Sequence, residues 1–284
     1  MHRIPVYQPD LTGKEREYVL ECLESTWISS KGRFIGEFET GFAGFIAAPH
    51  AACVSNGTVA LHLALLALDI GPGDEVIVPT LTYIASVNAI RYVGATPVFC
   101  DSHPDTWQMD PADVERRITS RTRAVMAVHL YGGACDMQAL ADICRRHGLK
   151  LIEDCAEAIG TRIDGRHVGT FGDVATFSFF GNKTITTGEG GMVVCGEAAV
   201  DDRIRRLRGQ GLAAKGEYWH DMVGYNYRMT NICAAIGLAQ LERVDEILAR
   251  KAALAADYRQ ALGSLPLGFQ ANLPGEVSSH WMVT

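Results

Sequence analysis

The sequence predicts an α/β fold in which helices cover both faces of a mostly parallel sheet. Between residues 51 and 194, short apolar runs that are typical of buried strands alternate with helical patterns. Short turns rich in Gly, Pro, Ser, Asn and Asp separate these elements. Because parallel strands need a crossover connection, this alternation indicates strands that are linked through helices and covered on both sides.

The composition is that of a globular protein. The chain has 284 residues, 48% hydrophobic and 21% charged, which suffices for one large domain or for one domain and a fragment. Its net charge is −7 and it has no basic block, which argues against a nucleic-acid partner. It has no apolar run long enough to span a membrane and no signal-peptide core at residues 1–5, so we expect a cytoplasmic protein. The eight cysteines lack C-x-x-C spacing, and we expect buried thiols rather than disulfides or a metal site.

The elements follow in chain order. Residues 12–25 begin with capping-box spacing and are predicted to form a helix, and residues 36–46 form a second helix with three phenylalanines along one side. We treat residues 1–48 as an N-terminal helical segment. The α/β part that follows has predicted strands at 51–54, 75–78, 97–100, 124–129, 150–153, 174–180 and 192–194, and predicted helices at 59–68, 82–92, 110–118 and 137–147.

Residues 205–228 are predicted to form a long loop, and long loops in compact domains are often functional. A basic cluster at Arg203–Arg208 precedes its glycines, and it could equally be the solvated face of a helix. Thr230 is placed to cap a long helix at 231–262.

The end of the chain is predicted to begin a second unit. Residues 280–284 have the pattern of the first residues of a strand. We therefore expect a large domain over 1–262 and, over 263–284, the start of a small C-terminal domain that is largely missing.

Polar groups stand at the ends of four predicted strands, and in a parallel sheet these ends meet in one crevice. They are the turn Ser55–Thr58, the ring of Tyr83, the carboxylates of Glu153–Glu157, and Ser178 with Lys183. Each has a plainer interpretation. The turn could be an ordinary helix cap, Tyr83 could be part of the core, and a lone loop lysine is usually a solvated charge.

Taken together, these groups match what a pyridoxal phosphate enzyme needs. A helix N-terminus binds the phosphate, a ring stacks on the pyridine, a carboxylate faces the pyridine nitrogen, and a lysine in a restricted site bonds to the cofactor. A dinucleotide-binding or P-loop protein is excluded, since neither G-x-G-x-x-G nor a Walker A motif occurs.

Four motifs in the same order carry a resemblance that runs from about residue 4 to the end. They are Ser-Asn-Gly-Thr-Val-Ala-Leu, Glu-Asp-Cys-Ala-Glu-Ala-Ile-Gly, Phe-Ser-Phe-Phe-Gly-Asn-Lys-Thr-Ile-Thr-Thr-Gly-Glu-Gly-Gly and Gly-Tyr-Asn-Tyr-Arg-Met-Thr. With them the chain resembles the DegT–StrS family of sugar aminotransferases. The resemblance implies the aspartate-aminotransferase-like fold type I and pyridoxal phosphate as cofactor.

The resemblance also implies roles for individual residues. Lys183 would bond to the cofactor and Asp154 would pair with the pyridine nitrogen. The other implied cofactor contacts are Gly57, Thr58 and Ser178 at the phosphate, Tyr83 on the ring, Glu157 near the phenolic oxygen, and Asn226 and Arg228 reaching the phosphate of a second subunit. Trp27, Ser29 and Lys31 match a family segment near the sugar nucleotide.

The activity implied is transfer of an amino group from L-glutamate to C4 of a 4-keto-6-deoxy sugar nucleotide by a homodimer with shared sites. The lysine loop is most similar to members that act on GDP-4-keto-6-deoxymannose. Two alternatives stay open at this point: another pyridoxal phosphate reaction on a sugar nucleotide, such as dehydration, and a non-catalytic homologue that binds cofactor or a partner.

Overall fold

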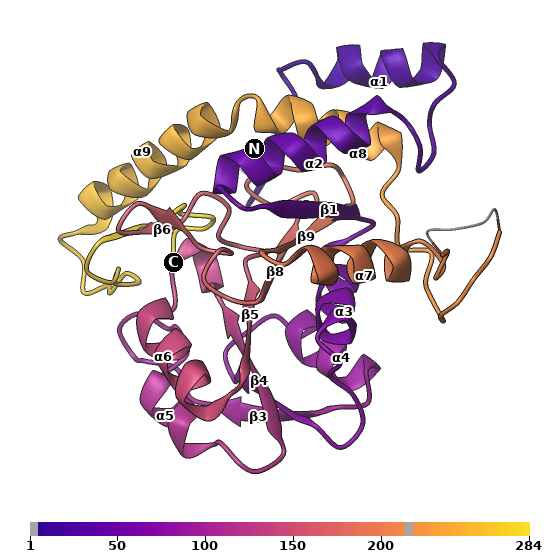
Figure 1. Cartoon of the computed structure of the whole chain (residues 1–284). Helices are drawn as coiled ribbons and strands as arrows, with labels where there is room; N and C mark the ends of the chain where they lie inside the picture. Colours follow the sequence, from indigo (N-terminus) through magenta and orange to yellow (C-terminus); the bar gives the residue numbers. More distant parts are fainter. Residues whose placement is uncertain (1–4, 214–217) are drawn as a thin grey trace.

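The computed structural model describes residues 5–213 and 218–284, and within them a seven-stranded sheet forms the centre (Figure 1). Its strands are β1 (His50–Val54), β2 (Glu75–Pro79), β3 (Thr96–Cys100), β4 (Thr122–Val128), β5 (Lys150–Asp154), β8 (Val174–Ser178) and β9 (Gly191–Cys195). They lie in the order β1-β9-β8-β5-β4-β2-β3. The strands from β3 to β8 pair in parallel, whereas β9 runs antiparallel to both of its neighbours. The predicted α/β fold with a mostly parallel sheet is confirmed.

Helices cover both faces of this sheet (Figure 1). One face carries α3 (Gly57–Ala67), α4 (Ala85–Tyr92) and α7 (Ala198–Arg208). The other carries α2 (Arg33–Ile46), α5 (Pro111–Arg116), α6 (Met137–His147) and α8 (Asn231–Leu241), with α1 (Glu15–Glu24) and α9 (Val244–Leu262) beside α8. Phe42 of α2 packs edge-on against Phe177 of β8 with ring centroids 4.9 Å apart. Burial of such a side chain contributes about 1.5–3 kcal/mol, which explains the phenylalanine stripe of α2.

A small three-stranded sheet brings the last residues back to the large one. It consists of β6 (Arg162–Ile163), β7 (Arg166–His167) and β10 (Glu276–Val277). Beyond β10, Ser278 Oγ donates a hydrogen bond of 2.9 Å to the carbonyl of Gly132, and the Ser279 N–H donates one of 3.1 Å to Thr161 Oγ1. Gly132 has φ +97°, and a Cβ there would lie 2.7 Å from the backbone nitrogen of Trp281. Residues 278–281 are thereby held against the carboxyl end of β4.

The expected N-terminal boundaries need correction. The first helix begins at Glu15 rather than at residue 12, because Thr12 does not cap it: its hydroxyl donates a hydrogen bond of 2.6 Å to Asp10 Oδ1. The second helix begins three residues earlier than expected, at Arg33. The helix expected at 82–92 begins only at Ala85.

The prediction of a loop at 205–228 is wrong for its first residues, because α7 continues to Arg208. The basic cluster therefore lies on a helix. Arg205 and Arg208 pair with the two oxygens of Glu39 on α2 at 2.8 and 2.7 Å, so this half-buried carboxylate offsets charge from both arginines. Four residues of the expected loop, 214–217, lie outside the described residues, as do residues 1–4 at the N-terminus.

The C-terminal part differs in two places. The helix expected at 231–262 is divided into α8 and α9, although Thr230 caps its start by accepting a hydrogen bond of 3.3 Å from the Cys233 N–H. The strand expected at 280–284 is not formed. The short strand β10 lies earlier, and His280 has φ +48°, which is incompatible with an extended chain. Within the described residues, no helix is both long and apolar enough to cross a membrane.

Candidate active site

Lys183 lies in the tight loop that follows β8. Its N–H donates a hydrogen bond of 2.9 Å to the carbonyl of Phe180, and its own carbonyl accepts one of 2.6 Å from the hydroxyl of Tyr7. The side chain of Lys183 is only 12% exposed. The lysine is therefore held in a defined, largely buried place, unlike a solvated surface charge.

Two carboxylates face the Lys183 amine. Its Nζ lies 3.5 Å from Oε1 of Glu157, whose Oε2 accepts a hydrogen bond of 2.9 Å from the Tyr131 N–H. Burial lowers the pKa of Lys183, and the charges of Glu157 and Asp154 oppose that shift only in part. Burial likewise raises the pKa of Glu157, against the influence of Lys183. Both shifts favour neutral forms, and a neutral amine is the nucleophilic form of lysine.

Asp154 is the last residue of β5 and is buried. Its Oδ2 accepts a hydrogen bond of 2.7 Å from the hydroxyl of Ser86 on α4, and its Oδ1 accepts one of 3.1 Å from the Ala156 N–H. A carboxylate has about four acceptor positions, so capacity remains for a further donor.

The start of α3 and the end of β8 form a close cradle. Asn56 caps α3 by accepting a hydrogen bond of 2.9 Å from the Val59 N–H. The backbone N–H groups of Gly57 and Thr58 find no acceptor among the residues that the structure describes. A Cβ on Gly57 would lie 2.8 Å from the Cβ of buried Ser178. This glycine leaves open the space beside two free N–H groups and a hydroxyl, which is the environment that a phosphate requires.

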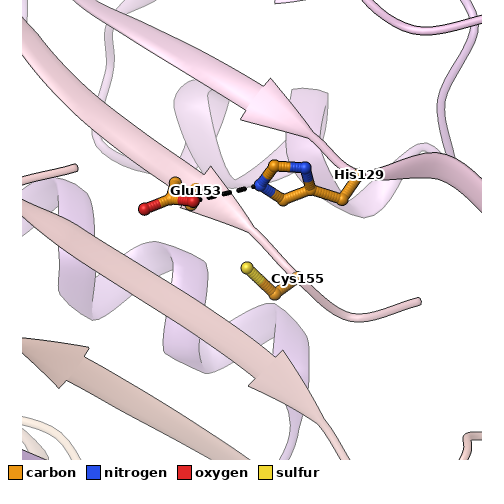
Figure 2. A group of neighbouring side chains, drawn as sticks. All are labelled: His129, Glu153 and Cys155. Carbon is orange, nitrogen blue, oxygen red and sulfur yellow. Dashed lines mark hydrogen bonds and ion pairs between the residues drawn. The ribbon is translucent and has the colours of Figure 1, made fainter. Parts of the chain in front are cut away.

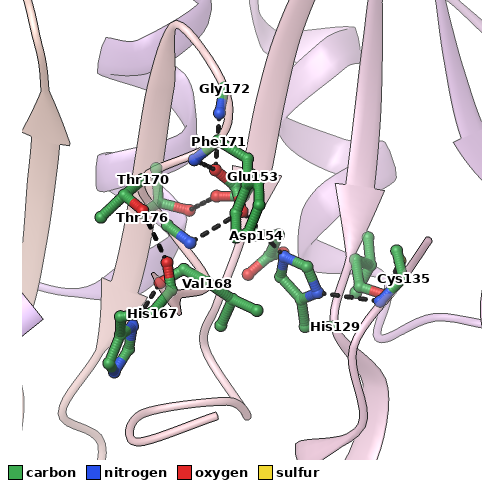
Figure 3. A network of polar contacts seen from close by, with 12 residues as sticks. His129, Cys135, Glu153, Asp154, His167, Val168, Thr170, Phe171, Gly172 and Thr176 are labelled. Atoms are coloured by element: carbon green, nitrogen blue, oxygen red, sulfur yellow. Dashed lines mark hydrogen bonds and ion pairs between the residues drawn. The ribbon is translucent and has the colours of Figure 1, made fainter. Parts of the chain in front are cut away.

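Glu153 precedes Asp154 in β5, so its side chain points to the opposite face of the sheet. Figure 2 shows it with two other buried side chains, His129 and Cys155. Ligand atoms of His129, Glu153 and Cys155 all lie within 4.8 Å of one another, which is close enough for a metal ion. However, Glu153 is fully used (Figure 3). It accepts hydrogen bonds from His129 Nε2 at 3.1 Å and from three backbone N–H groups, all at 2.7 Å: Gly169, Phe171 and Gly172.

The remaining atoms of this group are equally unsuited to a metal. His129 Nδ1 accepts a hydrogen bond of 3.1 Å from the Cys135 N–H, so the proton of the neutral ring lies on Nε2 and points at Glu153. Burial raises the pKa of Cys155 to about 12, which keeps its thiol protonated. Burial alone would raise the pKa of Glu153, yet the hydrogen bonds from His129 and the backbone hold it below its ordinary value. The group is a structural hydrogen-bond cluster around one ionised carboxylate, Glu153, and it fixes the 169–172 turn.

Comparison with known proteins agrees with this geometry. Residues 9–284 match the model of the DegT/DnrJ/EryC1/StrS aminotransferase family. The chain belongs to this family. It is 59% identical over 284 residues to a GDP-perosamine synthase of Escherichia coli O157:H7, covering 100% of this chain and 78% of that protein. It is 57% identical over 281 residues to a GDP-perosamine synthase of Vibrio cholerae, covering 99% and 77%.

Two solved structures have the same fold as this chain. S. venezuelae DesV, in complex with a ketimine intermediate, superimposes with a TM-score of 0.92 at 39% identity, covering 98% of this chain and 77% of that one. A Streptococcus pneumoniae protein described as a sugar aminotransferase, in its PLP form, gives 0.94 at 31% identity, covering 99% and 77%. The protein is thus an aminotransferase of fold type I with pyridoxal phosphate as its cofactor.

Three further residues that were expected in the site of this DegT/DnrJ/EryC1/StrS protein have exposed side chains. Tyr83 precedes α4 and is 71% exposed, so it is not a core residue. Asn226 and Arg228 are exposed near the end of β1, where Arg228 Nη2 donates to Asn226 Oδ1 at 3.2 Å. Within the described ranges, no hydrogen bond or ion pair joins these three side chains to Lys183.

The segment expected near the sugar nucleotide connects α1 to α2 and packs on α8. The carbonyls of Trp27 and Ser29 accept hydrogen bonds of 2.7 and 2.6 Å from the side chain and the backbone of Asn231. The side chains of Trp27, Ser29 and Lys31 are exposed, which leaves them free to meet a ligand. Within the described residues, no hydrogen bond or ion pair joins these three side chains to Lys183.

Sequence reasoning missed three residues around the lysine. Ser86 contacts Asp154, the Tyr131 N–H contacts Glu157, and the ring of Trp281 lies 4.0 Å from Lys183 Nζ. Ser86 could have been noticed as a hydroxyl on the apolar side of a predicted helix. Tyr131 and Trp281 carry no such signal, because they lie in irregular segments without periodicity.

Proposed function

We propose that this aminotransferase transfers the amino group of L-glutamate to C4 of GDP-4-keto-6-deoxymannose, forming GDP-perosamine and 2-oxoglutarate. The observation that carries the proposal is the largely buried Lys183 amine, placed between Glu157 and the end of β5 with a lowered pKa. The sugar is supported by the two relatives named GDP-perosamine synthase at 59% and 57% identity. A dehydration reaction is not favoured, since the lysine is present.

The residues around Lys183 and at the start of α3 fit the cofactor. The cradle of Gly57, Thr58 and Ser178 would hold the phosphate, and Glu157 would lie near the phenolic oxygen. Asp154 would face the pyridine nitrogen with its unused acceptor capacity and keep it protonated. Tyr83 would stack on the ring. When bound, pyridoxal phosphate supplies an electron-accepting ring that lets an amino group be exchanged for a carbonyl.

Lys183 would perform the proton transfers of the reaction. In its neutral form Nζ would attach the cofactor, and as a free amine it would take up and give back the proton of the donor's α-carbon. The carboxylate of Glu157 would stabilise a positive charge on Lys183 Nζ, since its Oε1 lies 3.5 Å from that nitrogen.

We also infer a homodimer with shared sites, in which Asn226 and Arg228 would reach the phosphate of the partner's cofactor. Three strongly exposed aromatic side chains support this inference, since Tyr83, Tyr218 and Trp219 are 71%, 89% and 66% exposed. Trp27, Ser29 and Lys31 would contact the nucleotide. A cytoplasmic location and a domain boundary after residue 262 remain proposals.

An assay of the whole reaction tests the proposal. The protein is incubated with pyridoxal phosphate, L-glutamate and GDP-4-keto-6-deoxymannose, and both 2-oxoglutarate and the aminated GDP-sugar are measured by mass spectrometry. Equal amounts of the two products are expected. A matched reaction with the corresponding dTDP-4-keto-6-deoxy sugar is the control for nucleotide specificity. Formation of 2-oxoglutarate without any aminated GDP-sugar would reject the substrate and retain the aminotransferase.

A further inference from the structure

The indole of Trp281 closes one side of the Lys183 site. The Nζ of Lys183 lies 4.0 Å from the centroid of this ring, while Oε1 of Glu157 lies 3.5 Å from the same nitrogen. Trp281 is 8% exposed. The ring covers one side of the amine and excludes water there, and this loss of hydration favours the neutral amine over the ammonium. The free amine is therefore held between a carboxylate and an aromatic face.

The edge of the same indole fixes the backbone of the lysine loop. Trp281 Nε1 donates a hydrogen bond of 2.7 Å to the carbonyl of Asn182, the residue before the lysine. The next carbonyl, that of Lys183, accepts the 2.6 Å hydrogen bond from Tyr7. Two successive carbonyls are thus tied down by side chains that lie far away in the sequence.

Trp281 is itself held in place from several sides. Its ring stacks on that of Tyr131 with centroids 6.4 Å apart and planes 8° apart, and its carbonyl accepts a hydrogen bond of 3.2 Å from Lys251 Nζ on α9. Tyr131 and His280 have φ +60° and +48°, a left-handed conformation that costs energy in residues other than glycine. Such conformations persist where the surrounding structure enforces them, and here both adjoin the tryptophan.

We propose that Trp281 is a positioning residue. It holds the Lys183 loop, and the Lys183 amine that is not bonded to the cofactor, in place beside the cofactor site. The inference rests on the proposed role of Lys183. Trp281 lines a groove of about 1210 Å³ next to α9, and Lys183 is not among its lining residues, so the indole separates the amine from that open space. Loss of the ring admits water to the amine.

The charged and titratable groups around this amine are few. Glu157 and Asp154 face it from the end of β5, and Tyr7 contacts its carbonyl from the N-terminal segment. Lys251 and His280 lie on the far side of Trp281. Burial is the largest cause of the lowered pKa of Lys183, so rehydration raises that pKa towards its ordinary value.

The first test is Trp281→Ala, with the rate at which cofactor-free protein combines with pyridoxal phosphate followed by absorbance across pH. The neutral amine adds to the aldehyde carbon, and water leaves as the C=N bond forms. We expect the apparent pKa of the lysine to rise by about one unit, and the rate near neutral pH to fall about tenfold. A pH profile that superimposes on that of the unaltered protein, in a variant with native circular dichroism, overturns the proposal.

The second test separates the ring face from the indole N–H. Trp281→Phe keeps the face and removes the donor to Asn182, so the pH profile stays in place while kcat falls about three- to tenfold, as expected for one hydrogen bond. KM for L-glutamate stays unchanged. If Trp281→Ala does not fold, Trp281→Phe serves as the test. An unchanged kcat in Trp281→Phe rejects the proposal that Trp281 positions the lysine loop.

The matched control is Trp107→Phe. Its ring packs edge-on against Tyr131 at 6.2 Å, in the same aromatic group but without contact to Lys183, and both readouts stay unchanged. Reductive trapping of the cofactor on Lys183 in the unaltered protein distinguishes the two proposals. Its failure rejects the proposed function, whereas silent Trp281 variants with successful trapping reject only this inference.

Discussion

Glu153 and Asp154 are successive residues of β5, both buried, on opposite faces of the sheet. Glu153 accepts hydrogen bonds from four N–H groups, three of them from one turn of the backbone. Asp154 accepts two, from Ser86 and Ala156, within the described part of the chain. A buried carboxylate whose oxygens are fully used stabilises a fold, while one with unused acceptor capacity is available to a ligand. Glu153 on one face of β5 therefore stabilises the fold, and Asp154 on the other face is available to a ligand.

The largest effect is expected at the lysine that faces Asp154. Lys183→Ala removes both the covalent attachment and the proton transfers, so turnover should fall by at least about 10³-fold. Lys251→Ala is the matched control, because burial also lowers the pKa of that lysine. The control should lose no more than about tenfold, the value of one hydrogen bond. Near-normal turnover of the Lys183 variant would show that another group performs the reaction.

Asp154→Asn should affect catalysis far more than stability. The amide keeps the shape and the contact with Ser86 but lacks the charge that keeps the pyridine nitrogen protonated, so kcat should fall by about 10²-fold or more. The free energy of unfolding should change by only about 1 kcal/mol. Urea denaturation and steady-state kinetics on the same preparation measure both, and a stable variant with full kcat would remove Asp154 from the site.

Glu153→Gln should give the opposite pattern. Its amide NH₂ group would face backbone N–H donors in a buried place, so the free energy of unfolding should fall by about 3–5 kcal/mol. The activity per folded molecule should be kept. If this variant were as stable as the unaltered protein but inactive, the assignment of the two faces would be reversed.

The free energy of unfolding should also depend on pH through Glu153. The pKa of Glu153 in the folded protein lies below its ordinary value of 4.5, so its stabilising contribution is present above that pH. This contribution is lost as the pH falls through the lower, folded-state pKa. Unfolding free energies measured at acidic pH should therefore decline more steeply for the unaltered protein than for Glu153→Gln. Parallel curves would contradict an ionised Glu153.

A small effect is expected at Ser86, which orients Asp154. Ser86→Ala removes the 2.7 Å hydrogen bond, and kcat should fall about three- to tenfold with little change in the melting temperature. Thr82→Ala is a matched control, since its hydroxyl contacts Ser86 at 3.2 Å but not Asp154.

Much of this arrangement could be predicted because it depends on local pattern. Apolar strands followed by small polar turns placed Ser178, Lys183 and the carboxylates after β5 at one edge of a parallel sheet. The antiparallel direction of β9 could not be predicted, since a buried strand has the same apolar pattern in either direction. The end of α7 was missed because two of its arginines, Arg205 and Arg208, pair with Glu39 on another helix, and the local sequence does not show this contact.

The partners of Lys183 could not be predicted for a similar reason. Trp281 lies 98 positions further along the chain, and its contact with the amine depends on how residues 278–281 dock onto Gly132 and Thr161. Tyr131 contributes its backbone N–H through a left-handed conformation that its residue type does not favour. Such contacts depend on tertiary structure and leave no periodic signal.

Chemical trapping can show whether the face of β5 that carries Asp154, with its unused acceptor capacity, holds the cofactor on Lys183. The protein is loaded with pyridoxal phosphate, reduced with sodium borohydride and digested, and the modified lysine is identified by mass spectrometry. We predict one modification, on Lys183. Modification of Lys251 or of another lysine in place of Lys183 would contradict the account.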